Sequence, residues 1–289
     1  MGNLRLFVAC VAIWGTTWLA IKYQLGRIAP EVSVSYRFLT ASFLIACYCR
    51  IRKLPLGFTA RQHAWIATFG VLMFGVSYVC VYYAEQHVVS GLVAVGYSAS
   101  PLLGAVGMRV FFGTPITRRI AMGSIMGMLG IVLVFWPEFA RLRGDGDTAV
   151  GAVFTVAAVL LSALGTLTAH RNNQAGLPLW QTMGWGMFYG SMFAFATALA
   201  MGKPLEFDLT PGYVLSLLYL AILGSVVAFA AYLTLVKNVG TARASYTGVM
   251  VPIVALVVSA AFEGFDWHPL TWLGIAVSVA GNVIILRRR

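Results

Sequence analysis

Long runs of apolar residues dominate this chain, and short polar stretches separate them. A helix needs about 20 apolar residues to cross the hydrocarbon core of a bilayer. Nine stretches without Asp, Glu, Lys or Arg are long enough, and a tenth is interrupted only by Arg37. We expect ten membrane-spanning helices over Leu6–Ile21, Val32–Cys49, Gln62–Ala84, Gln86–Met108, Ile120–Pro137, Thr148–His170, Asn172–Gly202, Leu209–Val236, Ala244–Phe262 and Trp267–Leu286.

Composition excludes a soluble protein. Apolar residues make up 60% of the 289 residues and charged residues 10%, against roughly 45–50% and 25% in soluble domains. Ten spans leave no room for a soluble domain.

The first run follows a single charge, Arg5, as in a signal peptide, but it continues to Ile21 without a cleavage site of small residues, so we expect a first span. The four cysteines lie in apolar runs, and we interpret them as small apolar side chains.

Charges in the connections predict the orientation, because basic residues collect in cytoplasmic loops. With a cytoplasmic N-terminus, the inner side holds thirteen basic residues and no acid: Arg5, Arg50, Arg52, Lys53, Arg61, Arg118, Arg119, Arg171, Lys237, Arg243, Arg287, Arg288 and Arg289. The outer side then holds all nine acids: Glu31, Glu85, Glu138, Asp145, Asp147, Glu206, Asp208, Glu263 and Asp266. The net charge of +11 therefore reflects topology, and no basic stripe indicates nucleic acid. We expect both termini in the cytoplasm.

The chain also repeats itself at an offset of about 150 residues. At 151, Pro101 aligns with Pro252, Gly123 with Gly274 and Gly130 with Gly281; at 150, Gly15-Thr16 aligns with Gly165-Thr166. Each half holds five spans, and five is odd, so the second half enters the membrane inverted. Inverted repeats are typical of secondary transporters. We predict a first repeat over 1–137, an outer connecting loop over 138–148 and a second repeat over 149–289.

Several short motifs carry a family resemblance that covers nearly the whole chain. They are Trp14-Gly15-Thr16-Thr17-Trp18, Arg37-Phe38-Leu39, Ser100-Pro101-Leu102-Leu103 and Phe112-Gly113-Thr114-Pro115-Ile116-Thr117, followed by Gly123 and Gly130, and by Pro252, Glu263, Gly274 and Gly281. The chain resembles the EamA-type branch of the drug/metabolite transporter superfamily, and within it the bacterial aromatic amino acid exporters.

This resemblance implies an all-α integral membrane protein of ten helices, in two inverted five-helix repeats around a central substrate cavity. It implies export of small metabolites across the bacterial inner membrane, and we expect a monomer to be functional. One departure concerns the Glu that the family usually has nine residues before the glycine at Gly123 or Gly274. Thr114 and Phe265 stand there instead, with Glu263 two residues away.

Polar aromatic residues deep in the spans are the candidates for the cavity, because hydrocarbon offers their N–H and O–H groups no partner. Tyr78 and Tyr82 are four residues apart on one helix face, as are Trp185 and Tyr189. We expect substrate contacts from Trp14, Thr17, Tyr78, Tyr82, Tyr97, Ser100, Trp185, Tyr189 and Tyr246. Ordinary packing is the alternative for each ring, and a hydroxyl can bond back to its own helix.

Other residues are candidates for motion or charge. Pro101 and Pro252 bend helices at repeat-related positions and are candidate hinges or fixed bends. Arg37 is the charge inside a span, so it either pairs with Glu31 or a loop acid, or binds a substrate carboxylate. Gly123 with Gly127, and Gly186 with Gly190, permit close helix packing.

No Asp or Glu lies in the middle of a span, which favours facilitated movement over an obligatory proton relay. The sequence contains no catalytic grouping, metal spacing or nucleotide motif, so we expect no enzyme and no cofactor. The expected partners are a small-molecule substrate and membrane lipids. The alternatives are a carrier of drugs, lipids or nucleotide sugars, and a membrane scaffold or channel subunit that does not transport.

Overall fold

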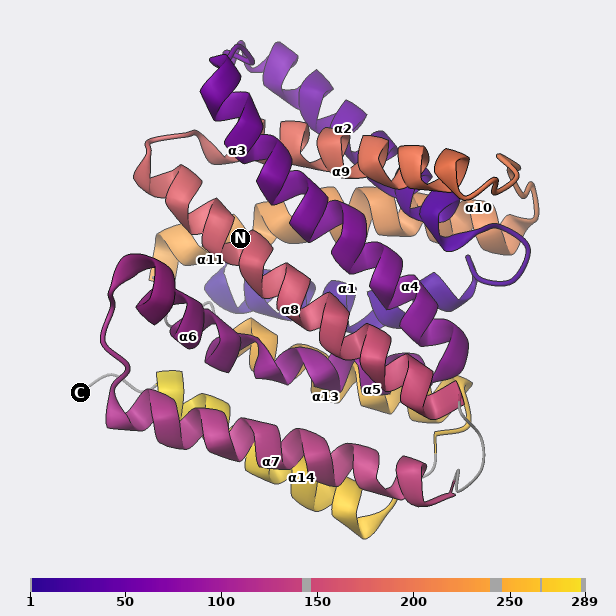
Figure 1. The fold of residues 1–289 in the computed structure, drawn as a ribbon, viewed down its shortest axis with the longest axis vertical. Helices are drawn as coiled ribbons and strands as arrows, with labels where there is room; N and C mark the ends of the chain where they lie inside the picture. Colours follow the sequence, from indigo (N-terminus) through magenta and orange to yellow (C-terminus); the bar gives the residue numbers. More distant parts are fainter. Residues whose placement is uncertain (1, 142–146, 240–245, 266, 287–289) are drawn as a thin grey trace.

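The computed structural model describes residues 2–141, 147–239, 246–265 and 267–286, which form helices joined by short connections, without a strand (Figure 1). Ten helical segments follow in chain order: α1 (Asn3–Lys22), α2 (Pro30–Ile51), α3–η1–α4 (Ala60–Gly70, Val71–Val76, Ser77–His87), α5–η2–α6 (Ser90–Gly96, Tyr97–Ala99, Ser100–Phe112), α7 (Arg118–Arg141), α8 (Asp147–Gln174), α9 (Leu179–Ala200), α10–η3–α11 (Pro211–Leu218, Tyr219–Val227, Ala228–Val239), α13 (Tyr246–Phe262) and α14 (Pro269–Leu286).

These segments confirm the ten-helix membrane architecture expected from the apolar runs. Among the described residues, seven segments are long and apolar enough to cross a membrane, and parts of α13 and α14 are shorter apolar helices. The ends differ by a few residues, because local caps decide where a helix starts. The side chain of Thr59, for example, accepts from the Gln62 N–H while the Gln62 side chain accepts from the Thr59 N–H, so α3 begins at Ala60.

The third and eighth helical segments each contain a stretch of π-helix. η1 covers Val71–Val76 and η3 covers Tyr219–Val227, and the two are separated by about the offset of the sequence repeat. In η3 the Ser225 hydroxyl donates to the Leu220 carbonyl, five residues earlier. A π-helical turn holds an extra residue and disturbs the regular hydrogen-bond ladder, and such turns are frequent at functional sites. The repeat therefore extends from the sequence to an irregularity of the backbone.

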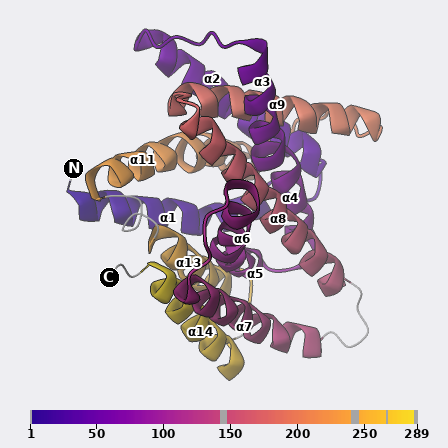
Figure 2. The same cartoon turned by 60° about the vertical axis from the view of Figure 1, so that its left-hand side comes forward.

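Close glycine contacts join the last helix of each half. A Cβ atom on Gly130 of α7 would lie 2.5 Å from the Gly274 carbonyl oxygen of α14, and one on Gly281 would lie 2.4 Å from the Gly123 carbonyl oxygen. No other residue type fits at these distances without moving a backbone. Figures 1 and 2 show α7 and α14 side by side at one edge of the bundle.

A similar contact holds the third segment against α9. A Cβ on Gly70 would lie 2.1 Å from the Gly186 carbonyl oxygen, and one on Gly190 would lie 2.7 Å from the Gly70 carbonyl oxygen. Gly186 and Gly190 therefore have the packing role that we expected for them. Gly127 differs, because its Cβ would meet only the Ser98 carbonyl, at an ordinary 3.7 Å. The start of α1 and the end of α14 lie on the same side in Figure 2.

Candidate functional site

Arg37 lies at the centre of a buried aromatic cluster. Its side chain extends from α2 and is 2% exposed. The guanidinium carbon lies 4.7 Å from the centre of the Tyr78 ring and 5.0 Å from that of Phe38, and these two rings meet edge to face. Nε and Nη1 of Arg37 have no hydrogen-bond partner among the described residues. A buried cation therefore rests against aromatic rings with two groups able to donate to an anion.

The N-terminal helix and η3 form a second wall of this cluster. Trp14 Nε1 donates to the Gly224 carbonyl at 3.1 Å. Thr17 is buried and donates to the Trp14 carbonyl at 2.8 Å, so its hydroxyl bonds back to its own helix. A Cβ atom on Gly224 would lie 2.8 Å from Thr17 Cγ2 and 3.7 Å from Arg37 Nη2. The lack of a side chain at Gly224 lets α1, α2 and the π-helix approach one another.

Tyr82 of α4 and Tyr97 of η2 belong to the same buried core. Tyr82 is fully buried, and its hydroxyl donates to Gln24 Oε1. The Tyr97 hydroxyl lies 3.3 Å from Ser77 Oγ, and the Tyr97 ring lies 5.2 Å from that of Trp18. Trp18 Nε1 has no partner in the described part of the chain. Trp18 was not among the expected site residues, although it ends the same Trp-Gly-Thr-Thr-Trp motif as Trp14.

Trp185 and Tyr189 lie apart from this cluster. Trp185 Nε1 donates to the Leu56 carbonyl at 2.9 Å, and the Tyr189 hydroxyl lies 3.0 Å from His63 Nδ1. Their rings stack on each other and fasten the connection between α2 and α3 to α9. Trp185 also lines a groove of about 310 Å³ between α2 and α9, in which Phe43 is largely exposed.

The remaining candidates take other positions. Ser100 is partly buried at the start of α6. Pro252 is buried within α13 and faces a small pocket that Val95 and Ser98 share. Tyr246 and Pro101 fall within helices, but their side chains lie outside the part that the structure describes.

The pairing of Arg37 with Glu31 is not formed. Glu31 is 1% exposed, and its Oε1 accepts a hydrogen bond from the Tyr83 hydroxyl at 2.7 Å. Glu31 and Arg37 are six residues apart on α2, which places them about 240° apart around the helix and about 9 Å apart along it. They therefore face different neighbours. Among the described ion pairs, none involves Arg37.

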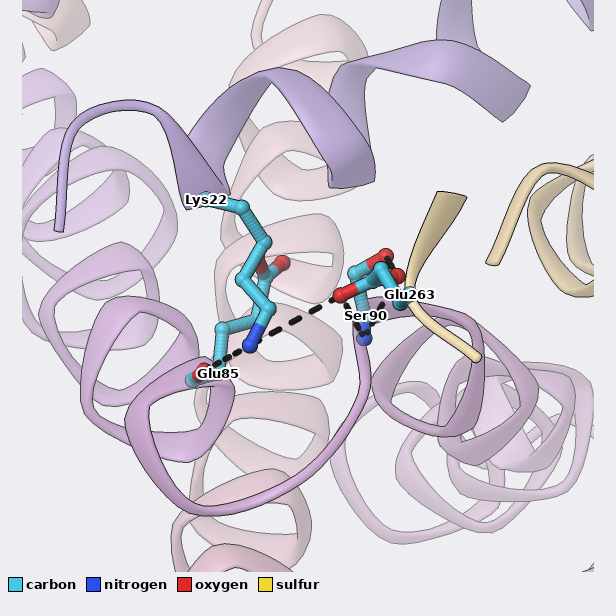
Figure 3. Close-up of polar contacts among 4 residues, drawn as sticks. All are labelled: Lys22, Glu85, Ser90 and Glu263. Atoms are coloured by element: carbon cyan, nitrogen blue, oxygen red, sulfur yellow. Dashed lines mark hydrogen bonds and ion pairs between the residues drawn. The ribbon is translucent and has the colours of Figure 1, made fainter. Parts of the chain in front are cut away.

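Sequence reasoning missed a second polar site, which Figure 3 shows at the predicted outer end of the bundle. Lys22 Nζ donates to the Glu85 backbone carbonyl at 3.0 Å and lies 3.6 Å from Glu263 Oε1. The Ser90 N–H lies 3.2 Å from both oxygens of Glu263, and its hydroxyl donates to Oε2. Four helix ends, those of α1, α4, α5 and α13, thus meet here. α13 comes from the second half and the others from the first.

The Glu85 carboxyl group itself is the unusual member of this site. It is fully buried, and neither oxygen has a hydrogen-bond partner among the described residues. We expected Glu31 and Glu85 on the outer side of the membrane, and the structure buries both side chains. An acid at the edge of an apolar run gives no sign of whether another helix end will cover it. The described residues contain no group of three or more side chains suited to a metal ion.

Comparison with known proteins agrees with this architecture. A model of the EamA-like transporter family matches twice, over residues 2–136 and 149–287. The inner membrane transporter YedA of Escherichia coli K12 is 28% identical over 98% of this chain and 90% of its own length. The protein PecM of Dickeya dadantii is 25% identical over 99% and 94%.

A solved crystal structure has the same fold, with a TM-score of 0.71 and 13% identity over 98% of this chain and 95% of its own. The resemblance noted from short motifs is thereby confirmed over both halves. The chain belongs to the EamA-like transporter family.

Proposed function

We propose that this membrane transporter exports amino acids with apolar or aromatic side chains across the inner membrane by alternating access. Membership of the family supports transport, and the relative YedA supports the inner membrane. The substrate class rests on the cluster around Arg37. The direction, out of the cell, follows from the resemblance to exporters.

The observation that carries this proposal is the pair of unpartnered donors on Arg37. A buried donor without a partner costs about 1–3 kcal/mol, so the site favours a ligand that accepts from it. A carboxylate accepts strong, charge-assisted hydrogen bonds from guanidinium N–H groups. An α-carboxylate is common to all amino acids, and we assign Arg37 to its recognition.

The surrounding rings favour an apolar or aromatic side chain. The rings of Tyr78 and Phe38 contact the guanidinium group, and Trp18 and Tyr97 pack against each other in the same core. Each aromatic contact is worth about 0.5–1.5 kcal/mol beyond the burial of area. A ligand that touches two rings therefore gains about tenfold in affinity.

Counterflow in proteoliposomes tests this assignment. We expect saturable exchange of phenylalanine, tryptophan or methionine. Phenylalaninamide keeps the ring and the amine but lacks the carboxylate, so its half-saturating concentration should be at least about tenfold higher, as expected for loss of a charge-assisted hydrogen bond. Equal transport of the amide, or transport of cationic dyes alone, would contradict the assignment and favour a drug carrier. Ionic current without saturation would favour a channel.

Alternating access requires both halves to move, and the orientation of the chain is part of the proposal. We assign hinge roles to Pro101 and Pro252. A reporter fused after residue 289 should read as cytoplasmic, and one inserted near residue 145 as periplasmic. The reverse result at either position would contradict the inverted arrangement that alternating access uses.

A further inference from the structure

The buried carboxyl group of Glu85 raises the question of its charge. Its neighbour Lys22 donates to the backbone carbonyl of Glu85 and pairs with the carboxylate of Glu263, rather than with the Glu85 carboxylate. A bare carboxylate without partners in such a place costs several kcal/mol, whereas a neutral carboxylic acid costs far less. The closed arrangement in Figure 3 therefore suits Glu85 with a proton bound.

The charged groups around Glu85 also favour the neutral form of its carboxyl group. Among the described residues, Lys22 on α1, Arg37 on α2 and Glu263 after α13 are the charged groups near enough to act on the carboxyl. The segments η1 and α5 contain no titratable side chain. Lys22 and Glu263 neutralise each other, and Arg37 rests against rings without a hydrogen bond to Glu85 in the described contacts.

Two further ionisable pairs lie on other faces of α4. His87 pairs with Asp147 of α8 at 3.3 Å, and Tyr83 donates to Glu31 of α2. His87 and Tyr83 are each two residues from Glu85, so they point about 200° away around the helix. Neither pair offers Glu85 a hydrogen-bond partner.

We propose that Glu85 is a proton-binding site that takes up one proton when the predicted outer end of the bundle closes. In the open form, water reaches the carboxylate, which is ionised. Closure brings Glu263 onto Lys22 and Ser90, covers Glu85, and transfers one proton from the outer solution to its carboxylate. Opening reverses the step. The inference rests on the proposed alternating access, and it replaces the expectation of movement without a proton site.

The size of the effect follows from linkage. If the closed form holds one more proton than the open form, the ratio of closed to open molecules rises about tenfold for each unit by which the pH falls. A group whose protonation does not change on closure contributes no such slope. The slope thus counts the protons taken up, and variants identify the group.

Pulsed electron spin resonance distances between the ends of α1 and α13 measure this ratio. Tyr23 and Phe262 are 58% and 71% exposed and suit spin labels, introduced as Tyr23→Cys and Phe262→Cys with the four native cysteines replaced by alanine. In nanodiscs between pH 5.5 and 8.5, we expect the short-distance fraction to increase as the pH falls. One unchanging distance over this range would overturn the proposal.

Three variants assign the proton. Glu85→Gln should remain closed, with less than about a twofold change in the ratio over the whole range, since a neutral amide needs no proton. Glu206→Gln removes an exposed acid that pairs with Arg27 at the same end, and it should keep the wild-type slope. Glu263→Gln should lower the closed fraction at every pH but keep the slope. A slope that persists in Glu85→Gln, or is lost only in Glu263→Gln, would overturn the assignment.

Amino acid counterflow distinguishes this inference from the proposed function. Counterflow with a flat pH response and an unchanging distance would contradict the proton site and leave the transport proposal intact. A one-proton slope that depends on Glu85, without amino acid counterflow, would contradict the substrate and support the proton site.

Discussion

Replacement of Arg37 by methionine separates recognition from stability. In the proposed complex, the guanidinium donates to a substrate carboxylate in a buried site. Loss of one partner of a buried, hydrogen-bonded charge pair costs about 2–5 kcal/mol. At about 1.4 kcal/mol for each factor of ten, Arg37→Met should weaken phenylalanine binding by about 30-fold to several thousand-fold.

The stability of the empty protein should respond differently. Methionine removes two donors that lack partners, each of which costs about 1–3 kcal/mol. It also removes the contacts of the cation with the rings of Tyr78 and Phe38, worth about 0.5–2 kcal/mol each. These terms oppose each other, so the thermal midpoint of Arg37→Met should equal or exceed that of the wild type. Arg37→Lys keeps the charge without the planar fork and should give an intermediate loss of binding.

Two measurements on the same preparations test this reasoning. Substrate affinity comes from phenylalanine counterflow, with phenylalaninamide as the matched ligand, and the thermal midpoint comes from unfolding in detergent without substrate. The amide should bind Arg37→Met and wild type about equally. Unchanged phenylalanine affinity in Arg37→Met would refute the role in binding. A fall in thermal midpoint that parallels the loss of affinity would show that Arg37 is a structural residue.

Three further predictions concern packing, the rings and the hinge. Gly274→Val should clearly lower the thermal midpoint, because the added side chain would collide with the Gly130 carbonyl oxygen. In the control Gly104→Ala, the added methyl group meets open space, so the change should be neutral or should stabilise the helix by about 0.5–1 kcal/mol. Tyr78→Ala should weaken phenylalanine counterflow about two- to tenfold, because Tyr78 contacts Arg37. Trp185→Ala should weaken it much less, because Trp185 lies apart and donates to the Leu56 carbonyl. Equal losses would contradict this division. Pro252→Ala should slow transport in a stopped-flow uptake assay without reducing membrane insertion. An unchanged transport rate would show that Pro252 is a fixed bend and not a hinge.

The sequence was sufficient for the helices but not for their irregularities. Nine charge-free runs and a tenth interrupted only by Arg37 located all ten segments, because charged side chains are rare in the hydrocarbon core of a bilayer. The π-helices were not foreseeable. No residue type in η1, Val71–Val76, marks a π-helix in the sequence, and the close packing of Gly75 against Gly190 of α9 involves a distant part of the chain.

The site was partly predictable for similar reasons. Tyr78 and Tyr82 share a face because of their spacing, and Arg37 was identifiable as the charge inside a span. That Trp185 and Tyr189 lie elsewhere depends on which helix packs against α9, which no local pattern reports. The burial of Glu85 likewise depends on the end of α13, about 180 residues later in the chain.

The glycine contacts between α7 and α14 have a consequence for how the two halves pair. Gly130 meets Gly274 and Gly281 meets Gly123, while Gly123 aligns with Gly274 and Gly130 with Gly281 in the repeat. Each surface therefore contacts its own counterpart, which is the signature of an isologous dimer interface. Two identical five-helix chains make this contact only if one lies upside down beside the other. Separate copies of such a five-helix unit would therefore need both orientations in the membrane to pair through these glycines.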